Sequence, residues 1–149
     1  MGETLGSLCD KLTIVKLKQW HSEDPGRLES LALQEKQMAA EIDQLLGDAV
    51  AGNIKADRLT FASNKVFKKE GNVVGQVVGG IGAIFAQLAD VNCKLWHEQE
   101  KVYEFEKVAA EERVTVVRKL GVLNLERNAC IDEIDKQFRS MIEKLQKTN

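Results

Sequence analysis

The sequence is poor in residues that interrupt helices or that cross-link small proteins. Its 149 residues include one proline, Pro25, and only 5% are aromatic. Because proline breaks a helix from within, a chain with a single proline can form long helices. The three cysteines, Cys9, Cys93 and Cys130, lack the paired spacing of a metal site or a disulfide framework. We therefore expect reduced thiols in a cytoplasmic protein.

An excess of charge of one sign is also missing. The formal net charge is −2, and the densest basic group, Lys65, Lys68 and Lys69, is short. This balance gives no electrostatic basis for binding nucleic acid or an anionic membrane. The first residues contain no basic stretch followed by an apolar run, so we expect no secretory signal. The most apolar run, residues 73–89, is short for a bilayer and predicts a buried helix rather than a membrane span.

What the chain does have is apolar residues at every third or fourth position, the pattern of amphipathic helices. The pattern predicts helices over residues 4–22, 27–46, 73–106 and 108–147, with a loop or short helix between 54 and 70. Helices joined by short connections pack antiparallel. The sequence therefore predicts one all-α domain over residues 1–149, a helical bundle of two hairpins with long third and last helices.

Glycines lie at four-residue intervals at the start of the third predicted helix. They are Gly71, Gly75 and Gly79, and Gly82 follows. Spacing of this kind removes side-chain bulk from one helix face, so another backbone can approach closely. We expect a tight helix crossing here, and the alternative is a flexible or ligand-facing segment.

The chain also repeats part of itself. Residues 5–21 align without gaps on residues 81–97, with Gly6 matching Gly82. Both tryptophans and both histidines of the protein fall at matching places, Trp20-His21 and Trp96-His97. We interpret this as a duplicated helical hairpin whose first helices lie in related environments around a pseudo-two-fold axis.

If the two tryptophans fill the core, the neighbouring histidines lie at its edge. Each has an acidic residue three positions later, Asp24 after His21 and Glu100 after His97. Such a histidine either bonds a carbonyl or carboxylate structurally, or acts as a general base or metal ligand. The paired carboxylate and histidine motifs of metal-binding bundles are absent from the sequence. We therefore predict no metal and no cofactor.

Polar residues interrupt the apolar faces of the third and fourth helices. Antiparallel packing of these helices brings Asn92 towards Arg127 and Asn128. Either these groups form a structural network that fixes helix register, or Arg127 grips the carboxylate or phosphate of an anionic or sugar-like ligand. The candidate binding residues are Trp20, His21, Asn92, Trp96, His97, Gln99, Asn124, Arg127 and Asn128.

The same residues carry a resemblance to a known family. Asn92-x-x-Leu95-Trp96-His97-x-x-Glu100, followed by Leu123-Asn124-x-x-Arg127-Asn128-x-x-Ile131-Asp132-x-Ile134-Asp135, resembles a bacterial family of unknown function. The chain departs from the family pattern at Gln99 and at Ala129-Cys130, where that pattern has acidic residues. The resemblance implies a helical bacterial protein, sometimes encoded beside cell-surface polysaccharide genes, with no established activity.

Two functions remain open on this evidence. The interpretation we favour is a non-enzymatic interaction or scaffold module that works as a homo-oligomer, as a dimer, with a further protein partner possible. It is based on the long last helix and on the absence of a catalytic pattern from the sequence. The alternative is a protein or enzyme that binds a small molecule at the polar cluster around Arg127.

Overall fold

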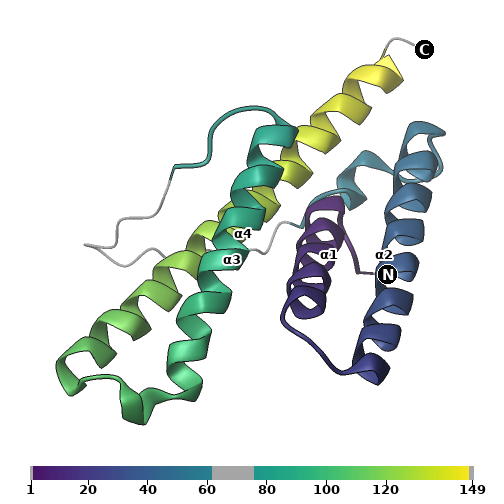
Figure 1. The fold of residues 1–149 in the computed structure, drawn as a ribbon. Coiled ribbons are helices and arrows are strands. Elements are labelled where there is room, and N and C mark those ends of the chain that lie inside the picture. The colour runs from purple at the N-terminus through teal and green to yellow at the C-terminus, as the bar shows by residue number, and fades with distance from the viewer. Residues whose placement is uncertain (1, 62–75, 148–149) are drawn as a thin grey trace.

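Two helical hairpins make up the structure, a computed structural model that describes residues 2–61 and 76–147. The helices are α1 (Leu5–Trp20), α2 (Pro25–Val50), α3 (Ile81–Tyr103) and α4 (Ala110–Lys147), and the short 3-10 turns are η1 (Ala56–Arg58) and η2 (Phe105–Lys107). Figure 1 shows α1 antiparallel to α2, and α3 antiparallel to the longer α4. The all-α bundle of two hairpins is therefore confirmed.

Side chains just before the first two helices fix where these helices begin. The hydroxyl of Thr4 accepts a hydrogen bond from the amide of Ser7 at 3.2 Å, so Thr4 caps the N-terminus of α1. The Asp24 carboxylate accepts from the amide of Gly26 at 3.1 Å, and Pro25 occupies the first helical position. For this reason α2 begins at Pro25, two residues earlier than predicted.

The glycine-rich approach to α3 differs from the prediction. The helix begins at Ile81 rather than Val73, because Gly79 adopts a positive φ of 104° that a right-handed helix does not contain. Gly71 and Gly75 lie outside the described residues. At Gly82 an added Cβ would meet no described atom within 4 Å. The expected helix crossing at these glycines is therefore wrong for Gly79 and Gly82.

The close helix contact occurs instead at Gly6, in the second position of α1. A Cβ added there would lie 2.5 Å from the carbonyl oxygen of Ile131 on α4, well inside van der Waals contact. The amide of Gly6 donates to Oδ1 of Asp135 at 2.7 Å, so a carboxylate of α4 caps the start of α1. Only a glycine lets the two backbones come this close.

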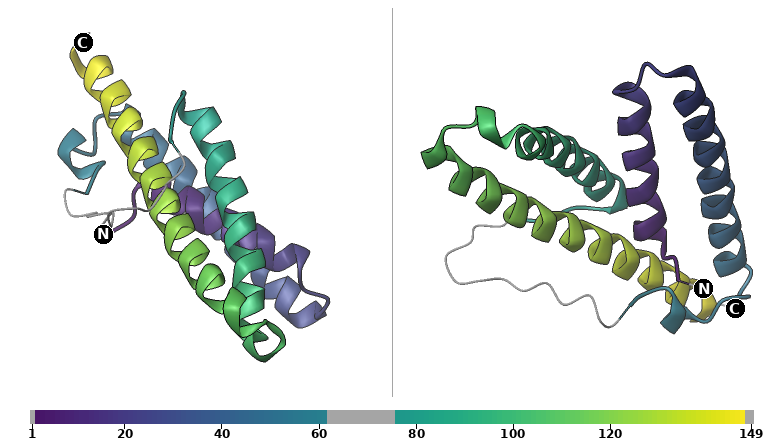
Figure 2. Two further views of the ribbon diagram at one scale, coloured as in Figure 1. Left: turned by 90° about the vertical axis from the view of Figure 1, so that its left-hand side faces the viewer. Right: turned by 90° about the horizontal axis from the view of Figure 1, so that it is seen from below.

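The hydrophobic core lies where α1 meets both helices of the second hairpin. Its most deeply buried members are Ile84 and Leu88 of α3 and Cys130 and Ile134 of α4, and Leu5 of α1 joins them. Figure 2 shows α1 between α2 and the second hairpin. As a result, α2 packs mainly on α1 and has few contacts with the second hairpin.

Candidate functional site

The predicted polar cluster forms around a residue that the sequence analysis did not select. Asp10 of α1 lies between the hairpins with 4% of its surface exposed. Its carboxylate accepts from Nε of Arg127 at 2.8 Å and from Nη2 at 2.5 Å, which is a two-pronged ion pair. Asn92 of α3 donates to the same carboxylate at 2.9 Å. One acidic side chain thus joins α1, α3 and α4.

Thr13, one turn after Asp10, completes this network. Its hydroxyl accepts from Nδ2 of Asn92 at 2.7 Å and donates to the backbone carbonyl of Asp10, also at 2.7 Å. Buried polar groups are costly unless they are bonded, and here nearly all of them are. The guanidinium of Arg127 is paired with the Asp10 carboxylate through Nε and Nη2. The geometry corresponds to the structural alternative, in which a polar network fixes helix register.

One acceptor in the network is left without a partner. Oδ1 of Asn92 is buried and has no hydrogen-bond partner among the described residues. Asn92 borders a cavity of about 130 Å³. The other residues lining this cavity are Ile14, Leu95, Trp96, Gln99, Asn124 and Arg127. A donor placed in the cavity would satisfy the orphan oxygen, so the cavity is the part of the cluster that has room for a ligand.

The two Trp-His pairs do not occupy related environments, which corrects the prediction. Trp20 is 85% exposed rather than part of the core, whereas Trp96 is half-buried. The ring of His21 stacks on Trp96 with centroids 4.7 Å apart and an interplanar angle of 22°. His97 is exposed and lines a pocket between α3 and α4. The docking of the hairpins therefore uses one histidine and one tryptophan, and no pseudo-two-fold axis relates the two pairs.

The acidic partners expected for the histidines bond elsewhere. Nδ1 of His21 lies 2.8 Å from the carbonyl oxygen of Leu17, while Asp24 caps α2. Glu100 accepts from Nε1 of Trp96 at 2.8 Å. No general base held by a carboxylate is therefore built at His21. Asn128 is exposed and forms no part of the Asp10 network.

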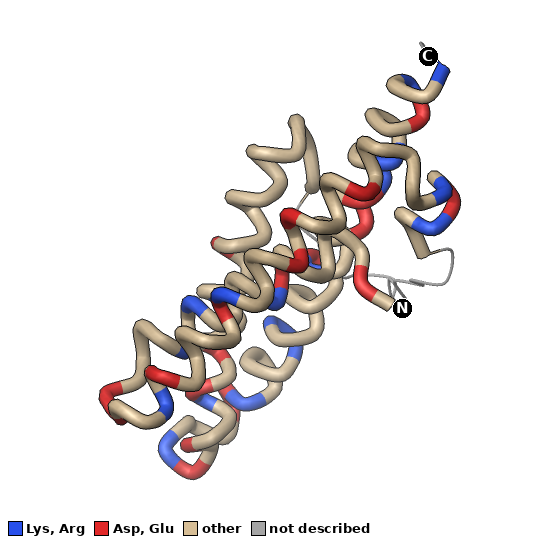
Figure 3. The backbone as a smooth tube through the Cα atoms, turned by 90° about the vertical axis from the view of Figure 1, so that its right-hand side faces the viewer, with Lys and Arg blue, Asp and Glu red and all other residues tan. Residues whose placement is uncertain are grey.

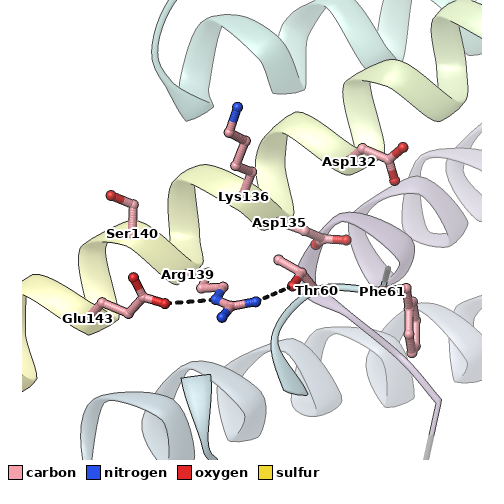
Figure 4. A pocket seen from close by; sticks show the side chains of 8 residues that line it. All are labelled: Thr60, Phe61, Asp132, Asp135, Lys136, Arg139, Ser140 and Glu143. Carbon is pink, nitrogen blue, oxygen red and sulfur yellow. Dashed lines mark hydrogen bonds and ion pairs between the residues drawn. The ribbon is translucent and has the colours of Figure 1, made fainter. Parts of the chain in front are cut away.

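A second charged pocket, of about 560 Å³, lies where α4 passes the segment after η1 (Figure 4). Arg139 crosses it, donating to Glu143 at 2.7 Å and to the hydroxyl of Thr60 at 2.8 Å. Asp135 lies at the inner edge of this pocket. Burial raises the pKa of its carboxyl to about 6, although hydrogen bonds from Thr4 and Gly6 lower it in part. The pocket ties the first connection to α4, and its charges are mostly paired.

The other titratable and nucleophilic side chains of the described residues do not gather into a site. Across residues 2–61 and 76–147, no three His, Cys, Asp or Glu side chains gather so as to hold a metal ion. Cys130 is buried and Cys9 is half-buried, and burial raises the pKa of each thiol to about 11. Cys93 is exposed, and all three cysteines are free.

Comparison of the chain with family models, with curated proteins and with solved structures gives no match. A search of the helices in the described part of the chain finds none that is long and apolar enough to cross a membrane. Figure 3 shows basic and acidic residues interleaved along the chain rather than gathered on one face.

Proposed function

We propose that the protein is a non-enzymatic interaction module that works as a homo-oligomer, in its simplest form a dimer. The observation that carries this proposal is the set of large apolar side chains that the fold leaves in water. Trp20 is 85% exposed, Val78 63% and Leu33 58%. A large apolar side chain that is left in water gains by burial against another protein, and aromatic side chains are enriched at such interfaces.

The pairing of the charged groups in the polar cluster supports the same proposal. Arg127 is held by Asp10 in the geometry of a structural ion pair, so the residue best suited to bind an anionic substrate is already occupied. The free thiols fit a reducing cytoplasm, where we place the protein. We also propose that the chain belongs to the bacterial family that the motifs around Asn92 and Arg127 resemble.

Sedimentation equilibrium between about 1 and 100 μM tests the proposal. We expect a mass above that of the 16.6 kDa chain, with dissociation on dilution. A chain that stays monomeric throughout this range would refute the homo-oligomer. Mass above the monomer that persists in the presence of detergent micelles would exclude nonspecific apolar aggregation.

A second function is favoured by the orphan oxygen of Asn92. The cavity it borders suits a small uncharged molecule that donates a hydrogen bond, because the charges around it are already paired. Native mass spectrometry of the purified protein would show a retained non-peptide mass. Gln99 and Asn124 line the cavity but are exposed, so Gln99→Ala and Asn124→Ala remove ligand contacts without disturbing the ion pair. Retention unchanged in both variants would contradict this function.

A further inference from the structure

The internal repeat extends from the first helix of each hairpin to the second. Aligning α2 on α4 at a spacing of 92 residues gives identical residues at Leu28/Leu120, Leu31/Leu123, Leu33/Leu125, Glu41/Glu133, Ile42/Ile134 and Asp43/Asp135. The second hairpin is longer at its turn, with residues 97–103 added to α3 and residues 110–116 added to α4. Because both helices gain seven residues, the register between the two helices of each hairpin is the same.

Within the chain, the first hairpin docks on the second through contacts at both ends of α1. At one end the amide of Gly6 donates to Asp135 at 2.7 Å. At the other end the ring of His21 stacks on Trp96 at 4.7 Å. Gly6 and His21 are fifteen residues apart, about 22 Å along a helix. One helix edge thus meets one acceptor and one aromatic ring on the neighbouring hairpin.

The repeat supplies a second set of the same four groups. Gly82 and His97 lie on α3 at the same fifteen-residue spacing, and Asp43 and Trp20 lie on the first hairpin. All four are exposed. A Cβ at Gly82 would meet no described atom within 4 Å, and no side chain caps the start of α3. The chain therefore carries both halves of a second docking contact, and the halves do not meet within one molecule.

Trp20 of the first hairpin borders an apolar cavity, and residues of α3 between Gly82 and His97 line its other side. Its volume is about 300 Å³, and it is lined by Thr13, Lys16, Leu17 and Trp20 of α1 and by Ala89 and Cys93 of α3. The first nine residues of α3, residues 81–89, carry no charge and appear as an uninterrupted tan stretch in Figure 3. An exposed helix edge made of small uncharged residues is suited to close contact with another helix.

We propose that the edge of α3 from Gly82 to His97 docks on the α1–α2 hairpin of a second copy of this chain. In this contact, His97 stacks on Trp20 of the second copy, and Asp43 of that copy accepts from the amide of Gly82. The proposal rests on the homo-oligomer proposed above and names its surface. Two copies related by a two-fold axis make the contact twice, which closes the assembly as a dimer.

The ion pair of the internal contact has no counterpart in the external one. The residues that align with Asp10 and Arg127 are Ala86 and Glu35, which cannot form an ion pair. The intermolecular contact therefore lacks the two-pronged ion pair between Asp10 and Arg127 that helps to hold α1 in place. We expect a dimer that dissociates on dilution rather than an obligate one.

Two substitutions test this surface without touching the monomer core. Gly82→Gln adds a side chain into open space in the monomer, but it blocks the close approach of a second copy. Trp20→Ala removes a ring that is 85% exposed. We expect each variant to raise the dimer dissociation constant at least about tenfold, measured by sedimentation equilibrium.

Matched controls use exposed positions outside the contact. Gly121→Gln places the same side chain at a second open helical glycine, and Tyr103→Ala removes a second exposed ring. We expect both controls to dimerise like the wild type, with circular dichroism showing equal helix content in all variants.

Asp43→Asn supplies an independent test, because it keeps the shape of the proposed acceptor and removes its charge. We expect a smaller increase in the dissociation constant, about three- to tenfold. A wild-type dimer that neither Gly82→Gln, Trp20→Ala nor Asp43→Asn weakens would overturn this surface while leaving the homo-oligomer intact. A monomeric wild type would overturn both proposals.

Discussion

The contact at Gly6 allows a prediction whose size follows from the structure. In Gly6→Ala, the new methyl group would lie 2.5 Å from the carbonyl oxygen of Ile131 and 3.0 Å from Oδ1 of Asp135. Both neighbours belong to a buried contact between α1 and α4, and the first is backbone that cannot rotate away. The two helices must therefore move apart.

Three contributions set the expected loss of stability. Forcing a methyl group into a packed contact costs about 1–3 kcal/mol. Lengthening the bond between the Gly6 amide and the Asp135 carboxylate loses part of a further 1.5–3 kcal/mol, roughly. Alanine regains about 1 kcal/mol of helix propensity. The net effect is a destabilisation of about 2–4 kcal/mol, or about 5–15 °C in melting temperature for a domain of this size.

Thermal and urea unfolding followed by circular dichroism measure this effect, with all samples at one protein concentration. Gly121→Ala is the matched control, because it makes the same change in an open helical position and should stabilise by up to about 1 kcal/mol. If Gly6→Ala melts within about 2 °C of the wild type, the close approach of α1 and α4 is not real.

Three further predictions concern charge, pH and thiol reactivity. Asp10→Asn should lower the free energy of unfolding by about 2–3 kcal/mol. A double-mutant cycle with Arg127→Met should show a coupling energy above about 1 kcal/mol, and additive effects would contradict the ion pair. Because burial raises the pKa of Asp135 from 3.8 to about 6, the folded state binds a proton that the unfolded state releases between these values. Stability should therefore fall as the pH rises through this window and level off above it, and Asp135→Asn should flatten this part of the urea midpoint profile. Cys93 is exposed and should react with a disulfide reagent in the native protein. Cys9 and Cys130 should react only on unfolding, because burial raises the pKa of each thiol to about 11.

The helices themselves were predictable, because their apolar periodicity and caps are local signals. The pattern placed Ile84, Leu88 and Val91 in the core, where the structure has them. It extended α3 too far towards its N-terminus because apolar residues before Gly79 continue the pattern, while the backbone at that glycine does not. Periodicity records which residues are apolar, and it does not record the φ of a single glycine.

The site was only half predictable for a different reason. Asn92 and Arg127 were recognised as polar residues on apolar faces, and the structure brings them together. Asp10 was missed, although it lies on the same face of α1 as Gly6 and Thr13. Its role depends on a partner 117 residues away, and no local pattern reports such a distance.

The exposure of Trp20 shows the same limit for the internal repeat. Identical sequence suggested identical surroundings, but the docking of one hairpin on the other is one-sided. Two copies of a motif in one chain can have different surroundings. Here the contact between the hairpins uses His21 from the first copy and Trp96 from the second, so Trp20 and His97 remain exposed.

The cap that Asp135 places on α1 has a consequence for the order in which the chain folds. The acceptor of the Gly6 amide, Asp135, is synthesised 129 residues after Gly6 itself. At about 5–20 residues per second, α1 waits roughly 6–25 s for its partner. During this time the first hairpin has no second hairpin of its own to cover its docking edge, and the completed second hairpin of a neighbouring chain offers the same acceptor. Synthesis on adjacent ribosomes would therefore favour chains that exchange hairpins.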